Sequence, residues 1–87
     1  MNEADRILLL LGYYADDSVK RLQIQSWIAE ADAFMQNAGV DKTQLVSASA
    51  SAIHTMWAEA RDAGIEIDIN GKHRIIYTLI DQLRSES

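Results

Sequence analysis

The 87-residue sequence has no cysteine, no proline and only four glycines. The absence of cysteine excludes disulfides and thiolate zinc sites within the chain. The absence of proline means that no helix is interrupted by the loss of a backbone N–H donor. The glycines (Gly12, Gly39, Gly64 and Gly71) are isolated from one another, which excludes the glycine-rich loops that hold nucleotide phosphates. The chain therefore favours uninterrupted helices and argues against nucleotide chemistry.

Basic residues are also scarce. Eight lysines and arginines stand against thirteen aspartates and glutamates, for a net charge of -5. The basic residues are scattered, so the sequence offers no patch that would neutralise DNA phosphates. The apolar run at residues 7–11 is too short to span a bilayer and lacks the layout of a signal peptide. We expect a soluble protein, cytoplasmic at synthesis, that associates with no membrane.

The remaining composition indicates one globular domain, residues 1–87. The hydrophobic fraction of 48% is ordinary for a folded protein. Apolar residues recur at helical spacing in four segments, which predict helices at about 3–11, 17–38, 42–62 and 72–84, with an arm at 64–71. The predicted fold class is all-α: a small bundle of about four helices. The two long helices are central, and an extended arm or loop precedes the short last helix.

The predicted helix 17–38 has apolar residues on two faces. One stripe is formed by Ile24, Ile28, Ala31, Met35 and Ala38. The opposite face carries Val19, Leu22, Ala29 and Ala33. Two apolar faces indicate a helix that is covered on both sides, or one that meets another subunit. The predicted first helix is apolar all round, which likewise indicates burial or a covering partner.

The start of the predicted helix 42–62 carries a capping signal. Asp41 and Gln44 are three residues apart, as in a capping box with aspartate in place of serine or threonine. The alternation at residues 47–52 is also compatible with a strand. We favour a helix because the 3.6-residue period continues on both sides.

The segment from Ile65 to Tyr77 is ambiguous. Ile65, Ile67 and Ile69 alternate with acidic residues before Asn70-Gly71, a strong hairpin signal. Residues 76–83 have a helical period, which favours an arm followed by a helix. An exposed arm of alternating isoleucines invites pairing with another chain, whereas the alternative is a loop folded over its own core.

No pattern in the sequence supports catalysis, a metal site or a cofactor site. His54 and His73 are the only histidines and lack the i, i+4 spacing of a metal pair. His54 falls roughly opposite the apolar face of its helix, so we expect a solvated or interface histidine. Asp16-Asp17 is explained by helix capping, because a helix N-terminus attracts carboxylates. The basic cluster of Lys72, His73 and Arg74 is either solvated or faces an acidic partner.

Four segments of the sequence resemble bacteriophage head–tail connector proteins. Residues 12–17 (GYYADD) and 27–35 (WIAEADAFM) resemble the acidic turn and second helix of that family. Residues 52–61 (AIHTMWAEAR) resemble its third helix, which often carries a histidine, an aromatic residue and an arginine. Residues 75–84 (IIYTLIDQLR) resemble its short closing helix, which ends in Leu-Arg.

The resemblance implies a structural virion protein at the head–tail junction, present in the host cytoplasm before assembly. Such proteins form a ring below the portal, extend the DNA channel and provide a platform for the tail. The implied partners are further copies of the chain, the portal protein and tail or stopper proteins, and DNA passes without specific binding. We expect partner contacts at Val19, Leu22, Trp57, Ile65, Ile67, Ile69, Lys72 and Arg74. The alternative is a small acidic helical adaptor or regulator without enzymatic activity.

Overall fold

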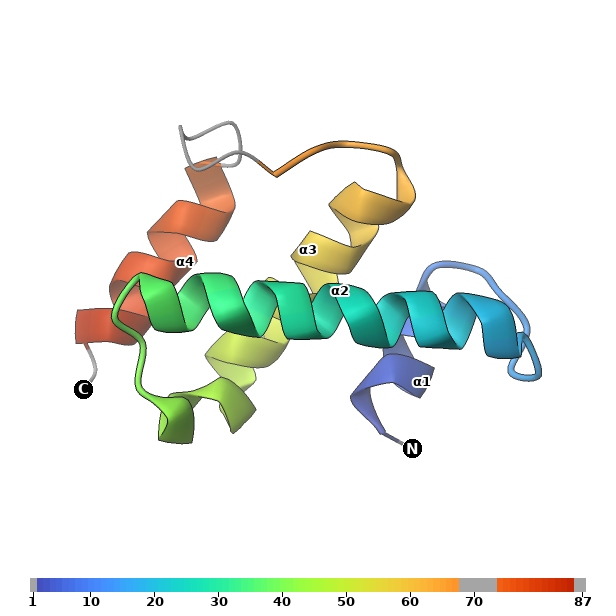
Figure 1. The fold of residues 1–87 in the computed structure, drawn as a ribbon, viewed down its shortest axis with the longest axis horizontal. Coiled ribbons are helices and arrows are strands. Elements are labelled where there is room, and N and C mark those ends of the chain that lie inside the picture. Colours follow the sequence, from blue (N-terminus) through green and yellow to red (C-terminus); the bar gives the residue numbers. More distant parts are fainter. Residues whose placement is uncertain (1, 68–73, 86–87) are drawn as a thin grey trace.

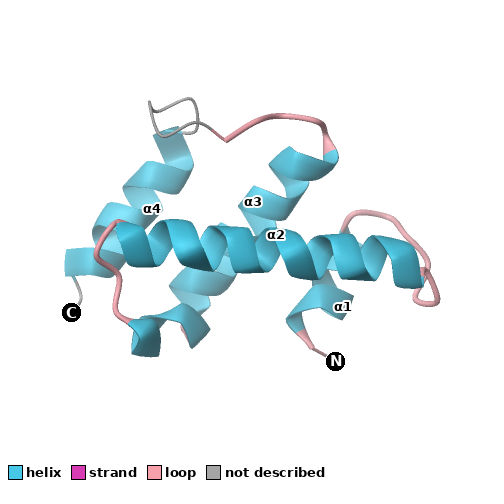
Figure 2. Cartoon of the chain, in the orientation of Figure 1, coloured by secondary structure: helices cyan, strands magenta, loops and turns pink. Residues whose placement is uncertain are grey.

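The computed structural model describes residues 2–67 and 74–85, and this part of the chain is a small all-α bundle with no strand. Its elements follow the order α1 (Glu3–Leu10), α2 (Ser18–Asn37), the 3-10 helix η1 (Lys42–Val46), α3 (Ala48–Asp62) and α4 (Arg74–Ser85). Within residues 2–67, loops and turns join α1, α2, η1 and α3 (Figure 2). The predicted fold class is therefore confirmed.

Helix α2 runs along the long axis of the molecule, and the other helices pack behind it (Figure 1). Helix α1 lies near the N-terminal end of α2, and α4 lies near its C-terminal end. Helix α3 lies between them and contacts α1, α2 and α4. The central position of α3 makes it the element through which the two ends of the bundle are joined.

The ends of α1 and α2 are set by local polar contacts. The side chain of Asn2 accepts a hydrogen bond from the Asp5 amide at 2.9 Å, and that of Asp17 accepts one from the Lys20 amide at 2.9 Å. Each bond satisfies an N–H group that has no partner inside its helix. Gly39 has a φ of 100°, the left-handed conformation that ends a helix, and it follows α2 as predicted.

The predicted helix 42–62 is wrong in one respect, because it is broken at Ser47. Residues 42–46 form η1, and the Asp41 amide donates to Gln44 Oε1 at 3.1 Å there. Helix α3 begins only after Ser47, whose hydroxyl accepts from the Ala50 amide at 3.1 Å. The side chain of Gln44 also donates to the Leu83 carbonyl at 2.8 Å, which ties η1 to α4. The signal at residues 41–44 thus opens a 3-10 turn, while Ser47 caps the long helix.

The core is built from one face of each helix. The predicted stripe of α2 is confirmed, because Ile24, Ala31 and Met35 are fully buried. The rest of the core cluster comes from α2 itself, from α1, α3 and α4, and from the loop after α2: Ala4, Ile7, Leu8, Trp27, Val40, Ala50, Ile53, Trp57, Ala58, Ile76, Ile80 and Leu83. The opposite face of α2, with Val19 and Leu22, is exposed within this chain.

The predicted arm is described only in part. Residues 65–67 have no regular secondary structure, and Ile67 packs partly against the core. Ile69, Asn70, Gly71 and Lys72 lie outside the described residues, so the choice between hairpin and arm falls there as well.

Candidate functional site

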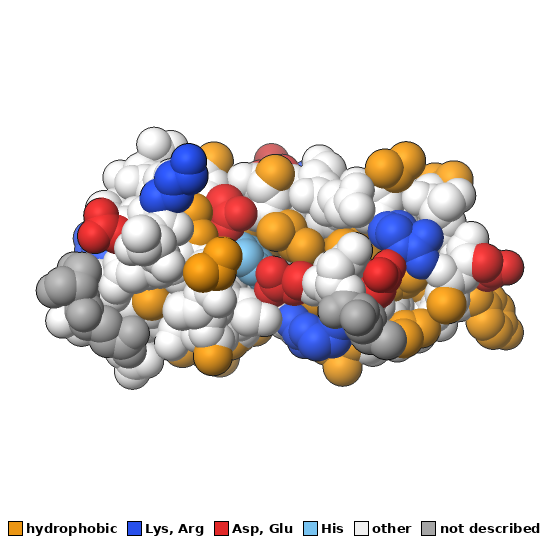
Figure 3. Space-filling model, turned by 90° about the horizontal axis from the view of Figure 1, so that it is seen from below, with side chains coloured by type: hydrophobic (Ala, Val, Ile, Leu, Met, Phe, Trp, Pro, Cys, Tyr) orange, Lys and Arg blue, Asp and Glu red, His pale blue; other side chains and the backbone are white. Residues whose placement is uncertain are grey.

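Exposed apolar side chains gather where α1 turns into α2, and we call this group surface A. It consists of Leu9, Leu10, Tyr14, Val19 and Leu22. Tyr14 has 84% of its surface exposed. Hydrophobic side chains are visible at this end of the molecule in Figure 3. Large apolar side chains exposed close together are a candidate site of interaction.

A small cavity of about 300 Å³ lies beside Leu9 and is lined also by Asp5, Leu8, Ala15 and Arg21. Its wall is fixed by an ion pair between Arg21 Nε and Asp5 Oδ1 at 2.5 Å. Arg21 also donates to the carbonyl of Ala15 in the turn. Surface A is therefore tied to α1, the turn and α2 by polar contacts at its edge.

A second apolar group, which we call surface B, lies between α3 and α4. It consists of Met56, Ala63, Ile65 and Ile75, which line a cavity of about 260 Å³. Ile65 and Ile75 are exposed, whereas Met56 is partly buried. Surface B has no residue in common with surface A.

The predicted contact residues divide into four groups. Val19, Leu22 and Ile65 are exposed and accessible to a partner. Trp57 is not accessible, because only 3% of its surface is exposed. It is a core residue, and its prediction as a contact residue is wrong. Ile67 is partly buried. Ile69, Lys72 and the side chain of Arg74 lie outside the described residues.

The sequence-based prediction missed six residues of these surfaces: Leu9, Leu10, Tyr14, Met56, Ala63 and Ile75. The first two belong to a run that is apolar all round, so its sequence does not show which members face outward. Tyr14 lies in a turn, where helical periodicity gives no direction. The exposure of Ile75 follows from the buried stripe of α4, since Ile76, Ile80 and Leu83 take the inner face.

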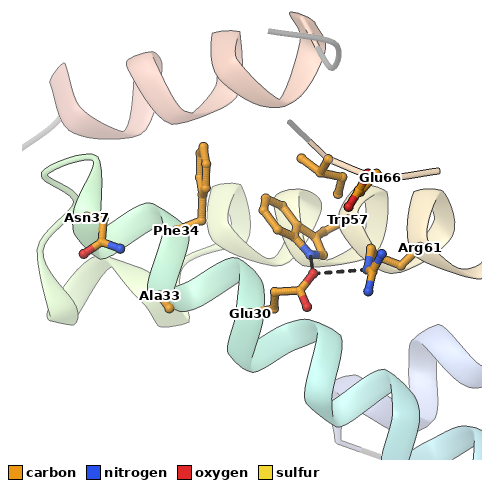
Figure 4. A pocket seen from close by; sticks show the side chains of 8 residues that line it. Glu30, Ala33, Phe34, Asn37, Trp57, Arg61 and Glu66 are labelled. Atoms are coloured by element: carbon orange, nitrogen blue, oxygen red, sulfur yellow. Dashed lines mark hydrogen bonds and ion pairs between the residues drawn. The ribbon is translucent and has the colours of Figure 1, made fainter. Parts of the chain in front are cut away.

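The indole of Trp57 belongs to a hollow between α2 and α3 of about 420 Å³ (Figure 4). Its N–H donates to Glu30 Oε1 at 2.9 Å, and its ring lies 5.3 Å from that of Phe34. Arg61 Nε is 3.1 Å from the same Glu30 oxygen, but its N–H has no hydrogen-bond geometry, so this contact is ionic. Glu30 thus neutralises Arg61 while it satisfies the buried indole.

His54 is buried, with 2% of its surface exposed, and the prediction of a solvated or interface histidine is wrong. Its Nδ1 lies 2.8 Å from Glu3 Oε1 of α1, and its Nε2 lies 2.5 Å from Asp32 Oδ1 of α2. Periodicity within α3 placed His54 on a polar face. It could not show that two carboxylates from other helices enclose that face.

The geometry around His54 limits its chemistry. Both ring nitrogens face carboxylates, so neither is available as a general base toward a serine hydroxyl. The two carboxylates lie on opposite sides of the ring. Among the described residues, no group of three or more histidine, aspartate or glutamate side chains is arranged so that it could hold a metal ion.

A polar network joins the α1–α2 turn to the end of α3. The Tyr13 hydroxyl donates to Asp62 at 2.9 Å, and Lys20 Nζ donates to Asp62 Oδ1 at 3.0 Å. Lys20 Nζ also lies 4.8 Å from the centre of the Tyr13 ring. The hydrogen bond to Asp62 raises the pKa of Lys20 above its ordinary value of 10.5, and partial burial opposes this effect.

This network predicts a dependence of stability on alkaline pH. Because the pKa of Lys20 is raised in the folded state, its contribution is complete below about pH 10.5 and is lost as the pH rises further. We expect Asp62→Asn to be less stable at neutral pH and to lose less stability than the wild type as the pH rises above about pH 10.5. Urea unfolding at each pH measures this. Lys42→Met, at an exposed lysine outside the network, is the control, and an unchanged slope in Asp62→Asn would contradict the assignment.

The described basic side chains are mostly neutralised within the chain. Ion pairs join Arg6 to Glu3, Lys20 to Asp62, Arg21 to Asp5, Arg61 to Glu30 and Arg84 to Asp81. The described surface therefore lacks a group of free cations that would release counterions from DNA. No helix within residues 2–67 and 74–85 has the length and apolarity required to cross a membrane.

Comparisons with models of known protein families, with curated proteins and with solved structures gave no match.

Proposed function

We propose that this chain is a non-enzymatic structural subunit of a phage-type head–tail junction. In this proposal, copies of the chain form a ring below the portal, which extends the DNA channel and offers a platform for the tail. The proposal joins the resemblance of residues 12–17, 27–35, 52–61 and 75–84 to the surfaces of the bundle.

The observation that carries the proposal is the presence of two unlike exposed apolar surfaces. Surface A lies on α1, the turn and α2, while surface B lies on α3, the following loop and α4. A contact between like surfaces joins two copies and stops there. A contact of surface A with surface B of the next copy leaves one surface free at each end, and it closes into a ring when the rotation fits.

The charge of the chain is consistent with a channel wall. The net charge is -5, and five of the described cations are paired with carboxylates. Since affinity for DNA depends on neutralising phosphates, such a wall lets DNA pass without binding it.

Two single variants test the contact between surfaces. Leu22→Glu places a charge on surface A, and Ile75→Glu places one on surface B; both side chains are exposed, so the fold should survive. We expect each variant alone to self-associate about tenfold or more weakly than the wild type, because a buried charge is costly in an apolar contact. A mixture should form a 1:1 heterodimer, since each variant retains the surface that the other lacks.

Native mass spectrometry of the separate and mixed variants measures this, and circular dichroism checks their helicity. A dimer formed by Ile75→Glu alone would show that surface A pairs with itself and would contradict a head-to-tail contact. The whole function would be contradicted by a wild-type chain that remains monomeric at high concentration and binds neither the portal nor the tail proteins encoded beside it.

A further inference from the structure

His54 joins three helices at one buried point. It projects from α3 and contacts Glu3 of α1 and Asp32 of α2. The charged groups that face it are Glu3 and Arg6 from α1 and Asp32 from α2, while η1 and its flank contribute only Leu45, Val46 and Ser47 to the same pocket. Figure 3 shows a histidine surface between acidic and hydrophobic side chains on this face.

With Glu3 and Asp32 ionised, the two contacts require a hydrogen on each nitrogen of the His54 ring. A carboxylate can only accept a hydrogen bond, so each ring nitrogen must carry a hydrogen to be satisfied. A neutral imidazole has only one N–H, and its other nitrogen would direct a lone pair at a carboxylate. With both carboxyl groups ionised, the arrangement of His54, Glu3 and Asp32 is therefore complete only with the doubly protonated ring.

Helix α1 depends on contacts of this kind. It has eight residues, too few to persist as an isolated helix in water. Its buried side chains are Ala4, Ile7 and Leu8. Its polar contacts with α3 are those of Glu3 with His54 and of Arg6 with the hydroxyls of Ser51 and Thr55, at 3.0 and 2.8 Å.

We propose that His54 is a proton-dependent clasp that holds α1 on the bundle. With two ring protons the clasp is closed. When the ring loses one proton, the contact to Glu3 is released rather than that to Asp32. The Asp32 contact is the shorter, at 2.5 Å against 2.8 Å, and Asp32 lies inside the 20-residue α2 while Glu3 lies in the first turn of α1.

The sign of the effect follows from the proton count. The closed state binds one proton more than the open state, so opening of α1 is favoured as the pH rises. One proton corresponds to an increase in opening of up to about tenfold per pH unit. Because α1 carries Leu9 and Leu10, opening also disrupts surface A. That consequence rests on the proposed function, whereas the release of α1 does not.

Amide hydrogen exchange of the full chain, at a dilution where it is monomeric, tests the clasp from about pH 5 to about pH 8. After correction for intrinsic exchange, we expect protection of the α1 amides to fall as the pH rises, while the amides of α3 stay protected. Nitrogen chemical shifts of the His54 ring should show two N–H groups at the acidic end and one at the basic end.

The variant Glu3→Gln distinguishes a proton-dependent contact of α1 from a general loss of stability with pH. A glutamine amide donates to Nδ1 of a neutral ring, while Nε2–H still donates to Asp32, so the neutral ring is then fully satisfied. We expect the pH dependence of α1 protection to become nearly flat in this variant. Glu59→Gln, on the exposed side of α3, should retain the wild-type dependence. The proposal is overturned if wild-type protection does not change with pH, or if Glu3→Gln changes as steeply as the wild type.

Discussion

Replacing Trp57 by alanine is expected to lower the free energy of unfolding by about 3–5 kcal/mol. The side chain is almost fully buried at the centre of α3, it packs against Phe34, and its N–H is bonded to Glu30. Removal of the ring leaves a cavity that a small core can close only in part. Small domains are stable by only about 5–15 kcal/mol, so the variant should be near the limit of folding.

The variant Trp57→Phe separates the contribution of ring packing from that of the hydrogen bond to Glu30. A phenyl ring keeps much of the packing against Phe34 but lacks the N–H group. The partner oxygen of Glu30 stays near Arg61 and is partly exposed, so it does not become an isolated buried charge. We expect a smaller loss, near 1 kcal/mol for the hydrogen bond plus a modest packing cost. Urea unfolding followed by circular dichroism measures both variants. A loss below about 1 kcal/mol for Trp57→Ala would contradict its place in the core.

The faces of the helices could be predicted because they follow from spacing alone. The buried stripe of α2 and the exposed positions of Val19 and Leu22 are both consequences of the helical period. Gly39 was predictable for a similarly local reason, since a left-handed residue is needed where α2 ends. These features depend on residues within one or two turns of each other.

The wrong predictions have two causes. In one, two local signals compete; in the other, the decisive contact joins residues that are distant in the sequence. Two capping signals lie six residues apart, at Asp41 and Ser47, and the sequence did not show that the second begins α3. The bond from Gln44 to the Leu83 carbonyl helps to hold η1 as a separate turn, and it joins residues 39 positions apart. His54 was misjudged because its partners, Glu3 and Asp32, lie on other helices. The same holds for the predicted contact residues. The exposed aliphatic residues among them were partly predictable, but Trp57 was predicted to face a partner although it is buried in the core.

The neighbouring residues Leu8 and Leu10 provide a second large contrast, because the same substitution should act on different properties. Leu8 is fully buried, whereas Leu10 has 59% of its surface exposed. We expect Leu8→Ala to lower the free energy of unfolding by about 2–5 kcal/mol, through lost burial and a residual cavity. Leu10→Ala should change it by less than about 0.5 kcal/mol, as at other surface positions.

Under the proposed function, we expect Leu10→Ala to have the clear effect on self-association, although it has the smaller effect on stability. Leu10→Ala removes apolar area from surface A in a protein that remains folded, so it should weaken self-association without a change in the unfolding midpoint of the dilute monomer. Urea unfolding at low concentration and sedimentation over a concentration series measure the two properties separately. Equal stability losses for both variants would contradict the orientation of α1. An unchanged association constant for Leu10→Ala, with stability also unchanged, would remove Leu10 from the contact and leave Leu9 as the remaining member of surface A on α1. Leu8 and Leu10, two residues apart, therefore test with one substitution which side of α1 stabilises the fold and which side would meet a partner in the proposed ring.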